Sequence, residues 1–171
     1  MKEIEKFYNE IKNINYGWYD KKGNLHKKLK GENFSKLYRM QKTKDIRKNN
    51  YAICWEMCEL ERLYFISKNI HHKTIFALLK EDKRFPCHTF LVFNLNDKWY
   101  WFEASWDKKK GIYEYQSLEE ILNYIKDNFE DFAGREYNKE KIEFYEYKKS
   151  LIRPNCNMFY YNCLHGKKLK Y

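Results

Sequence analysis

Apolar side chains recur at helical spacing in several segments of the chain. Over residues 2–14 they fall on one stripe, which predicts an amphipathic helix. Over about residues 52–67 they occur on nearly all sides, a pattern typical of a buried helix. A capping box that begins at Ser117 predicts a helix over residues 117–129, and a last short helix is predicted over residues 155–164.

Four other segments have the composition of strands rather than helices. They cover residues 73–80, 87–94, 98–104 and 141–147, and they are rich in aromatic and β-branched side chains. Residues 33–49 are polar and ambiguous, with room for a short helix before the buried one. The order of these elements predicts an α+β fold, with the buried helix packed on an antiparallel sheet.

The second and third strands are expected to form a hairpin. A four-residue loop over Asn94–Asp97 would place Phe93 opposite Lys98. The alternative is a two-residue loop of Asn96 and Asp97, which shifts the register by two residues. Both loops keep the same side chains on the same face of the sheet, because side chains alternate with a period of two.

Length and composition indicate one domain, residues 1–171. The chain is 21.4 kDa, with 43% hydrophobic and 34% charged residues, so it can bury a core without disulfides. No run approaches the roughly 18 apolar residues that a membrane-spanning helix needs. The first residues, Met1–Lys6, lack the apolar stretch of a signal peptide. We therefore expect a cytoplasmic protein with no membrane partner.

The net charge of +10 and an aromatic content of 19% leave nucleic-acid binding open as an alternative. The basic residues, however, are spread along the whole chain among acidic ones and form no arginine-rich stripe. The densest runs, Lys27–Lys30, Lys108–Lys110 and Lys167–Lys168, are interpreted as solvated loops and a tail. We expect no specific nucleic-acid partner.

Five cysteines, an odd number without a clustered framework, indicate reduced thiols. Cys156, Cys163 and His165 resemble half of a zinc site, but their spacings of seven and two match no common ligand pattern. No metal and no cofactor are therefore expected.

Three residues, Cys54, His88 and Glu103, have the types and the order of a catalytic site. Cys54 lies at the start of the buried helix, where the positive end of the helix dipole favours a thiolate. His88 and Glu103 lie on the paired strands and share a face, directly opposite each other with the four-residue loop or diagonal with the two-residue loop. Cys87 points to the opposite face, and Cys58, one turn further along the helix, is expected to be a core thiol.

Each of these three residues has an ordinary structural explanation when taken alone. A free cysteine is often a small buried hydrophobic residue, and a histidine or glutamate can be satisfied within a sheet. Together, in this order and at this spacing, Cys54, His88 and Glu103 predict a nucleophile, its base and the group that orients the base.

On these residues the chain resembles the transglutaminase-like superfamily of papain-related thiol enzymes, and most closely the small stand-alone bacterial and phage members. The resemblance covers about residues 47–107 as the catalytic core. It implies a papain-like α+β fold with a Cys54–His88–Glu103 triad. The chain departs from the family pattern in having Ala52 where a glycine is usual and glutamate in place of aspartate. Asp107 is a second candidate to orient the histidine.

The oxyanion hole is only partly specified by the sequence. The backbone N–H of Cys54 can supply one donor, and Gln41 and Trp18 are the candidates for a second. The side chains that could line an acyl-binding groove are Trp55, Trp101 and Trp106. Burial of these tryptophans in the core is the alternative interpretation.

The resulting hypothesis is acyl transfer from an amide through a thioester on Cys54, with a protein or peptide as substrate. The net positive charge favours an acidic one. A cysteine peptidase or amidase is favoured. The alternatives are a protein-glutamine transglutaminase or deamidase, and a catalytically silent interaction module on the same fold.

Overall fold

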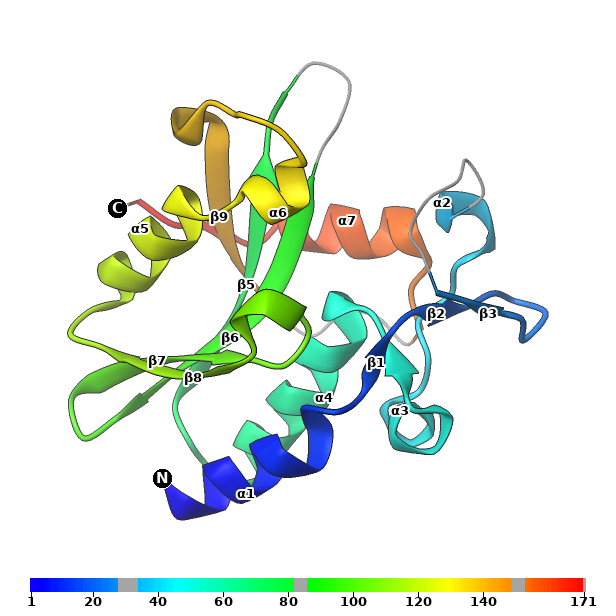
Figure 1. Cartoon of the computed structure of the whole chain (residues 1–171), viewed down its shortest axis with the longest axis horizontal. Coiled ribbons are helices and arrows are strands. Elements are labelled where there is room, and N and C mark those ends of the chain that lie inside the picture. The colour runs from blue at the N-terminus through cyan, green and yellow to red at the C-terminus, as the bar shows by residue number, and fades with distance from the viewer. Residues whose placement is uncertain (28–33, 82–85, 149–152, 171) are drawn as a thin grey trace.

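A computed structural model describes residues 1–27, 34–81, 86–148 and 153–170. Its centre is a six-stranded antiparallel sheet with the strand order β10-β9-β5-β6-β7-β8 (Figure 1). The strands are β5 His72–Leu79, β6 Cys87–Leu95, β7 Lys98–Glu103, β8 Gly111–Tyr115, β9 Ile142–Tyr147 and β10 Lys167–Lys168.

Helices cover both faces of this sheet. On one face lie α1 (Lys2–Ile11), α4 (Cys54–Ser67) and α7 (Cys156–Leu164), which share a core with Phe76, Leu91 and Phe102 of the sheet. On the other face α5 (Leu118–Asp127) and α6 (Glu130–Ala133) share a core with Phe90, Trp101 and Phe144. Figure 1 shows the two groups of helices on opposite sides of the strands.

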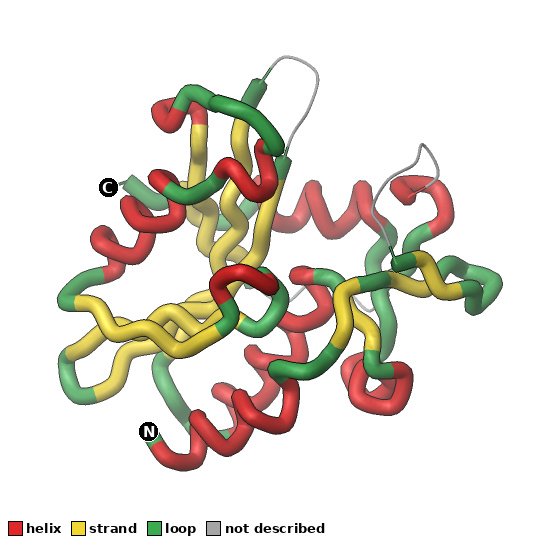
Figure 2. Tube along the Cα trace, viewed as in Figure 1, coloured by secondary structure: helices red, strands yellow, loops and turns green. Residues whose placement is uncertain are grey.

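Short elements surround the beginning of α4 (Figure 2). β1 (Asn15–Tyr16) pairs in parallel with β4 (Tyr51–Ala52), and β2 (Trp18–Tyr19) pairs with β3 (Leu25–His26). The helices α2 (Phe34–Leu37) and α3 (Thr43–Asn49) lie between β3 and β4 in sequence. Two 3-10 turns, η1 (Asp107–Lys109) and η2 (Lys139–Lys141), precede β8 and β9.

The mixed α+β architecture with a buried helix against an antiparallel sheet is confirmed. All four expected strands and the expected helices are present, with ends that differ by a few residues. The edge strands β8 and β10 were not expected. Lys167–Lys168 forms β10 rather than a tail, and Lys28–Lys30 of the first basic run lies outside the described residues. Among the described helices none is both long and apolar enough to cross a bilayer.

The four-residue hairpin loop is wrong, and the two-residue alternative is confirmed. Leu95 pairs with Lys98, and the two loop residues Asn96 and Asp97 have φ of 52° and 62°. Positive φ at both central positions is the geometry of a type I′ turn, whose twist matches that of the strands. Phe93 consequently faces Tyr100 rather than Lys98.

His88 and Glu103 lie just beyond the paired part of β6 and β7, at the end far from the turn. The β6–β7 ladder ends at Leu91 and Phe102, so the two strands are no longer paired at His88 and Glu103. Extending the register would put His88 diagonal to Glu103, on the same face of the sheet. Their side chains can therefore meet where the strands begin to separate.

Candidate active site

The start of α4 is held by a network around the buried carboxylate of Glu56. This side chain accepts hydrogen bonds from the backbone N–H of Gln41 (2.8 Å), from Nε2 of Gln41 (3.0 Å) and from the N–H of Ile53 (3.3 Å). Ile53 precedes the helix, so Cys54 is the first helical residue. The thiol consequently lies at the positive end of the helix dipole, which favours its ionised form.

His88 and Glu103 form the central contact of the site. Nε2 of His88 lies 2.8 Å from Oε2 of Glu103, and the side chains are only 1% and 2% exposed. The second oxygen, Oε1, accepts from the backbone N–H of Ser105 (2.8 Å), its hydroxyl (2.9 Å) and the N–H of Trp106 (2.8 Å). Burial raises the pKa of Glu103, but the His88 cation and these donors outweigh it and lower the pKa below its usual value. Glu103 is therefore a carboxylate held in one orientation.

Aromatic rings enclose the imidazole. The ring of Phe132 stacks on His88 with centroids 4.5 Å apart and an interplanar angle of 19°. Trp106 meets the same ring edge-on at 5.6 Å, and Phe90 stacks at 6.1 Å. These rings keep water away from the hydrogen bond between His88 and Glu103, which strengthens it electrostatically.

Cys54 completes the arrangement. Its thiol, 6% exposed, lies close enough to the His88 ring to interact with it, and the Thr89 backbone N–H also faces the sulfur. Since Nε2 is bonded to Glu103, Nδ1 is the nitrogen left for the thiol, and this buried atom has no aligned hydrogen-bond partner among the described residues. Catalytic contacts of this kind are often loose without substrate and tighten in the complex.

The electrostatics favour a thiolate–imidazolium pair. Burial raises the pKa of Cys54, but the adjacent His88 ring and its positive charge outweigh it, so the pKa is lowered below its usual value. Burial lowers the pKa of His88, whereas the charges of Glu103 and Cys54 raise it to about 10. Both shifts act in the direction that activates a thiol nucleophile.

The other four cysteines behave in the opposite way. Burial raises the pKa of Cys58, Cys87, Cys156 and Cys163, to about 11 in the case of Cys156. None of the five forms a disulfide. Cys54 is consequently the one cysteine whose pKa is shifted downward.

The amide of Gln41, one of the two candidate oxyanion donors, is engaged elsewhere. Nε2 of Gln41 donates to Glu56 and to the carbonyl oxygen of Tyr51 (2.9 Å), so both of its N–H groups have acceptors. The Trp18 ring stacks on His26 with centroids 4.1 Å apart. Gln41 thus supports the start of α4 rather than pointing at a reacting atom.

Of the three tryptophans expected to line a groove, Trp106 alone contacts a triad ring. Its Nε1 donates to Asp131 (2.9 Å). Trp55 stacks on Phe159 at 4.3 Å in one core, and Trp101 is fully buried in the other. For Trp55 and Trp101 the core interpretation fits their surroundings.

Asp107, the second candidate to orient the histidine, does not contact it. Its Oδ1 pairs with Nζ of Lys110 at 2.8 Å, and the side chain is 73% exposed. Glu103 occupies the orienting position instead.

Two residues at this site were not anticipated. Phe132 covers His88 from α6, and Tyr16 packs against the buried cluster that contains Cys54, with its hydroxyl near that residue. Neither carries a local sequence signal, because Tyr16 reaches Cys54 only through the pairing of β1 with β4.

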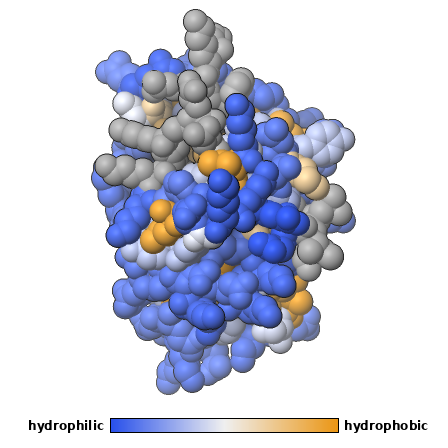
Figure 3. Space-filling model, turned by 90° about the vertical axis from the view of Figure 1, so that its right-hand side faces the viewer, coloured by the Kyte–Doolittle hydropathy of each residue, from blue (hydrophilic) through white to orange (hydrophobic). Residues whose placement is uncertain are grey.

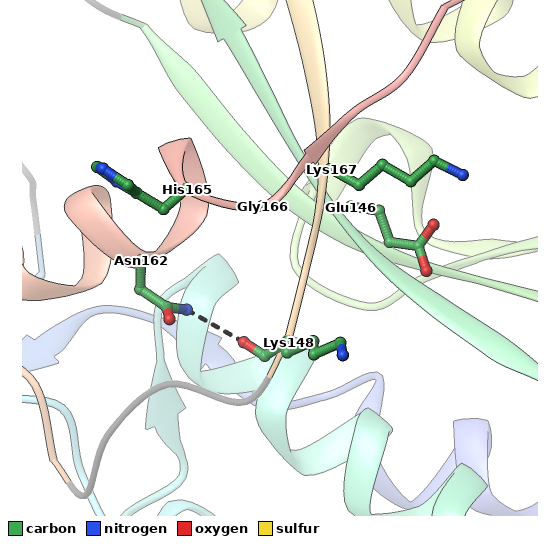
Figure 4. A pocket seen from close by; sticks show the side chains of 6 residues that line it. All are labelled: Glu146, Lys148, Asn162, His165, Gly166 and Lys167. Carbon is green, nitrogen blue, oxygen red and sulfur yellow. Dashed lines mark hydrogen bonds between the residues drawn. The ribbon is translucent and has the colours of Figure 1, made fainter.

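Other surface features offer weaker sites. A hollow near α7 and β10 is lined by Lys148, His165 and Lys167 among others, but Figure 4 shows these side chains pointing in different directions. The face that carries β2, β3 and α2 is mainly hydrophilic, with separate hydrophobic spots (Figure 3). Within the described part of the chain no three His, Cys, Asp or Glu side chains are placed to share a metal ion.

Comparison with protein-family models, with curated proteins and with solved structures gave no significant match. The chemistry of the site is consequently argued from its own geometry.

Proposed function

We propose that the protein is a thiol-dependent acyl-transfer enzyme acting on amide bonds, with Cys54 as nucleophile, His88 as base and Glu103 as the orienting carboxylate. The observation that carries this proposal is the buried 2.8 Å contact between His88 and Glu103 beside a cysteine at a helix start. The same arrangement supports a papain-like or transglutaminase-like fold as the finer description of this α+β domain.

In the proposed reaction the Cys54 thiolate attacks the carbonyl carbon of an amide. The resulting tetrahedral intermediate collapses to a thioester as the His88 imidazolium protonates the leaving amine. A water molecule then attacks the thioester carbon while His88 accepts its proton, and the C–S bond breaks, which releases the carboxylic acid and restores the Cys54 thiolate. Glu103 keeps the ring oriented and stabilises its cationic form throughout.

Hydrolysis makes the enzyme a cysteine peptidase or amidase, which is the function we favour. With a second amine in place of water, the same thioester would give a transglutaminase. A net charge of +10 favours an acidic protein or peptide as substrate. Five free thiols fit a reducing compartment such as the cytoplasm.

The test is the rate at which iodoacetamide alkylates each cysteine at pH 6.5, followed by mass spectrometry of peptides. Cys54 should react far faster than the other four thiols, because its pKa is lowered and theirs are raised, so it has the largest thiolate fraction of the five. His88→Ala should abolish the preference. His72→Ala is the matched control, since the ring of His72, at the start of β5, bonds the carbonyl oxygen of Ile70 instead. Equal, slow labelling of all five cysteines in the wild type would instead favour a catalytically silent interaction module.

A further inference from the structure

Tyr16 reaches the reacting residue through a short parallel ladder. In this ladder Tyr16 pairs with Ala52, two residues before Cys54, and the N–H of Gly17 donates to the carbonyl oxygen of Ala52 at 3.2 Å. A residue on β1 is thereby fixed beside the turn that leads into α4. Figure 1 shows β1 running next to the beginning of that helix.

The ring of Tyr16 packs against the buried core cluster that includes Cys54, and its hydroxyl lies near the backbone N–H and the thiol of that residue. Burial and the neighbouring Cys54 raise the pKa of Tyr16 well above its ordinary value. The phenol therefore keeps its proton over the whole neutral range and can act as a donor.

We propose that Tyr16 is a further catalytic residue, the second donor of the oxyanion hole. This inference rests on the proposed function. In the resting enzyme its O–H donates to the Cys54 thiolate. When sulfur bonds to the carbonyl carbon, the π electrons of the C=O bond move to oxygen, and the negative charge leaves the sulfur. The Tyr16 O–H then donates to that oxyanion together with the backbone N–H of Cys54. As the tetrahedral intermediate collapses, the electron pair returns to the C=O bond and the amine leaves.

This role follows from where charge develops. A donor that already faces the sulfur needs only a small shift to reach an oxygen that forms one bond away from it, next to the same backbone N–H. Gln41 cannot take this role in the described arrangement, because both N–H groups of its amide are bonded to Tyr51 and Glu56.

The experiment compares two reactions of Cys54 at pH 8 in the full chain. Acetylation by p-nitrophenyl acetate passes through an oxyanion, whereas alkylation by iodoacetamide does not. Tyr16→Phe removes one oxygen atom and should slow acetylation about 10²-fold, the scale for one oxyanion-hole donor. Alkylation should change much less. Tyr51→Phe is the matched control, on the neighbouring strand, and should leave both rates unchanged. Thermal unfolding by circular dichroism checks that both variants fold.

The results distinguish an oxyanion donor from a structural or blocking role of Tyr16. Selective loss of acetylation supports Tyr16 as an oxyanion donor. Equal losses in both reactions would overturn this role in favour of a structural one, and increases in both would overturn it in favour of a residue that blocks the thiol. Unchanged rates would also overturn it. If wild-type Cys54 is acetylated no faster than in His88→Ala, the proposed function itself fails, and the role of Tyr16 fails with it.

Discussion

Replacing Glu103 by glutamine tests the site most directly, because the structure dictates how the new amide must lie. Oε1 of Glu103 receives three hydrogen bonds, from the N–H of Ser105, its hydroxyl and the N–H of Trp106. In the glutamine variant only the carbonyl oxygen can accept them. The NH₂ group is then directed at Nε2 of His88, which must become an acceptor.

The cost of the opposite orientation can be worked from the same contacts. A flipped amide would leave the N–H groups of Ser105 and Trp106 without an acceptor, at about 1–3 kcal/mol each. That penalty keeps the NH₂ group facing His88. The single proton of the neutral ring then moves to Nδ1, and the carboxylate that stabilised the imidazolium is gone. Both changes oppose removal of a proton from Cys54.

The expected loss follows from the thiolate fraction. With an ordinary thiol pKa of about 8.5, about 1% of Cys54 would be thiolate at pH 6.5, so alkylation should slow by up to about 10²-fold. Acyl transfer should suffer more, because a triad with the wrong tautomer loses on the order of 10⁴-fold. The pH dependence of iodoacetamide alkylation measures the first effect, and p-nitrophenyl acetate turnover measures the second.

A matched control is available four residues away. Asp107→Asn makes the same change of carboxylate to amide at an exposed position that pairs with Lys110. It should alkylate with the wild-type pH profile. If Glu103→Gln keeps the wild-type profile as well, the hydrogen bond to His88 does not activate Cys54, and the reasoning is refuted.

Four further outcomes are expected. Acyl transfer should follow a bell-shaped pH profile, rising as Cys54 ionises below the ordinary thiol pKa and falling as His88 loses its proton near pH 10; an acid limb near pH 8.5 would contradict the ion pair. Phe132→Ala should expose the imidazole to water and weaken the attraction of Glu103 and Cys54 for it, which moves the acid limb of alkylation to higher pH. A limb that moves to lower pH would show that relief of desolvation dominates, and an unmoved limb would show that the stacked ring has no electrostatic role. Glu56→Ala leaves three buried donors unpaired and should lower the free energy of unfolding, measured by urea titration, by about 3 kcal/mol or more. A change below about 1 kcal/mol would show that the hydrogen bonds of Glu56 do not hold the start of α4. Asp97→Gly relieves a positive φ of 62°, which costs a residue other than glycine about 1–2 kcal/mol, but it adds unfolded-state entropy that offsets about 0.4–1 kcal/mol. The free energy of unfolding should therefore rise by about 1 kcal/mol or less, and destabilisation would argue against the type I′ turn.

The elements with strong local patterns could be predicted from the sequence. The buried helix at Cys54 and the strands that carry His88 and Glu103 follow from apolar periodicity, and the structure has them. The prediction that His88 and Glu103 share a face did not depend on the loop length, because loops of two and four residues differ by an even number. The prediction that these two residues are directly opposite each other is wrong, because it depends on the turn, and the positive φ values at Asn96 and Asp97 were not recognised from the sequence.

Non-local contacts account for what could not be predicted. β1 and β4 are two residues each, and their pairing joins Tyr16 to a segment more than thirty residues away. No periodicity marks so short a ladder. Gln41 shows the reverse limitation: its residue type suits an oxyanion donor, but its amide is bonded within the Glu56 network. Residue type gives the chemistry that a side chain can perform, and only the fold shows whether its donors are free to perform it.

The register also explains how a glutamate at position 103, one methylene longer than aspartate, reaches the imidazole of His88. Directly opposed residues of an antiparallel pair have Cβ atoms about 4.5–5.5 Å apart, whereas diagonal neighbours are about 7–8 Å apart. The two-residue turn makes His88 and Glu103 diagonal, and the ladder ends before it reaches them. One additional methylene spans much of that added distance, and the carboxylate still lies 2.8 Å from the ring nitrogen. The turn at Asn96–Asp97 and the length of the acid at position 103 are therefore linked: a four-residue loop would bring the strands' side chains into direct opposition and favour the shorter acid.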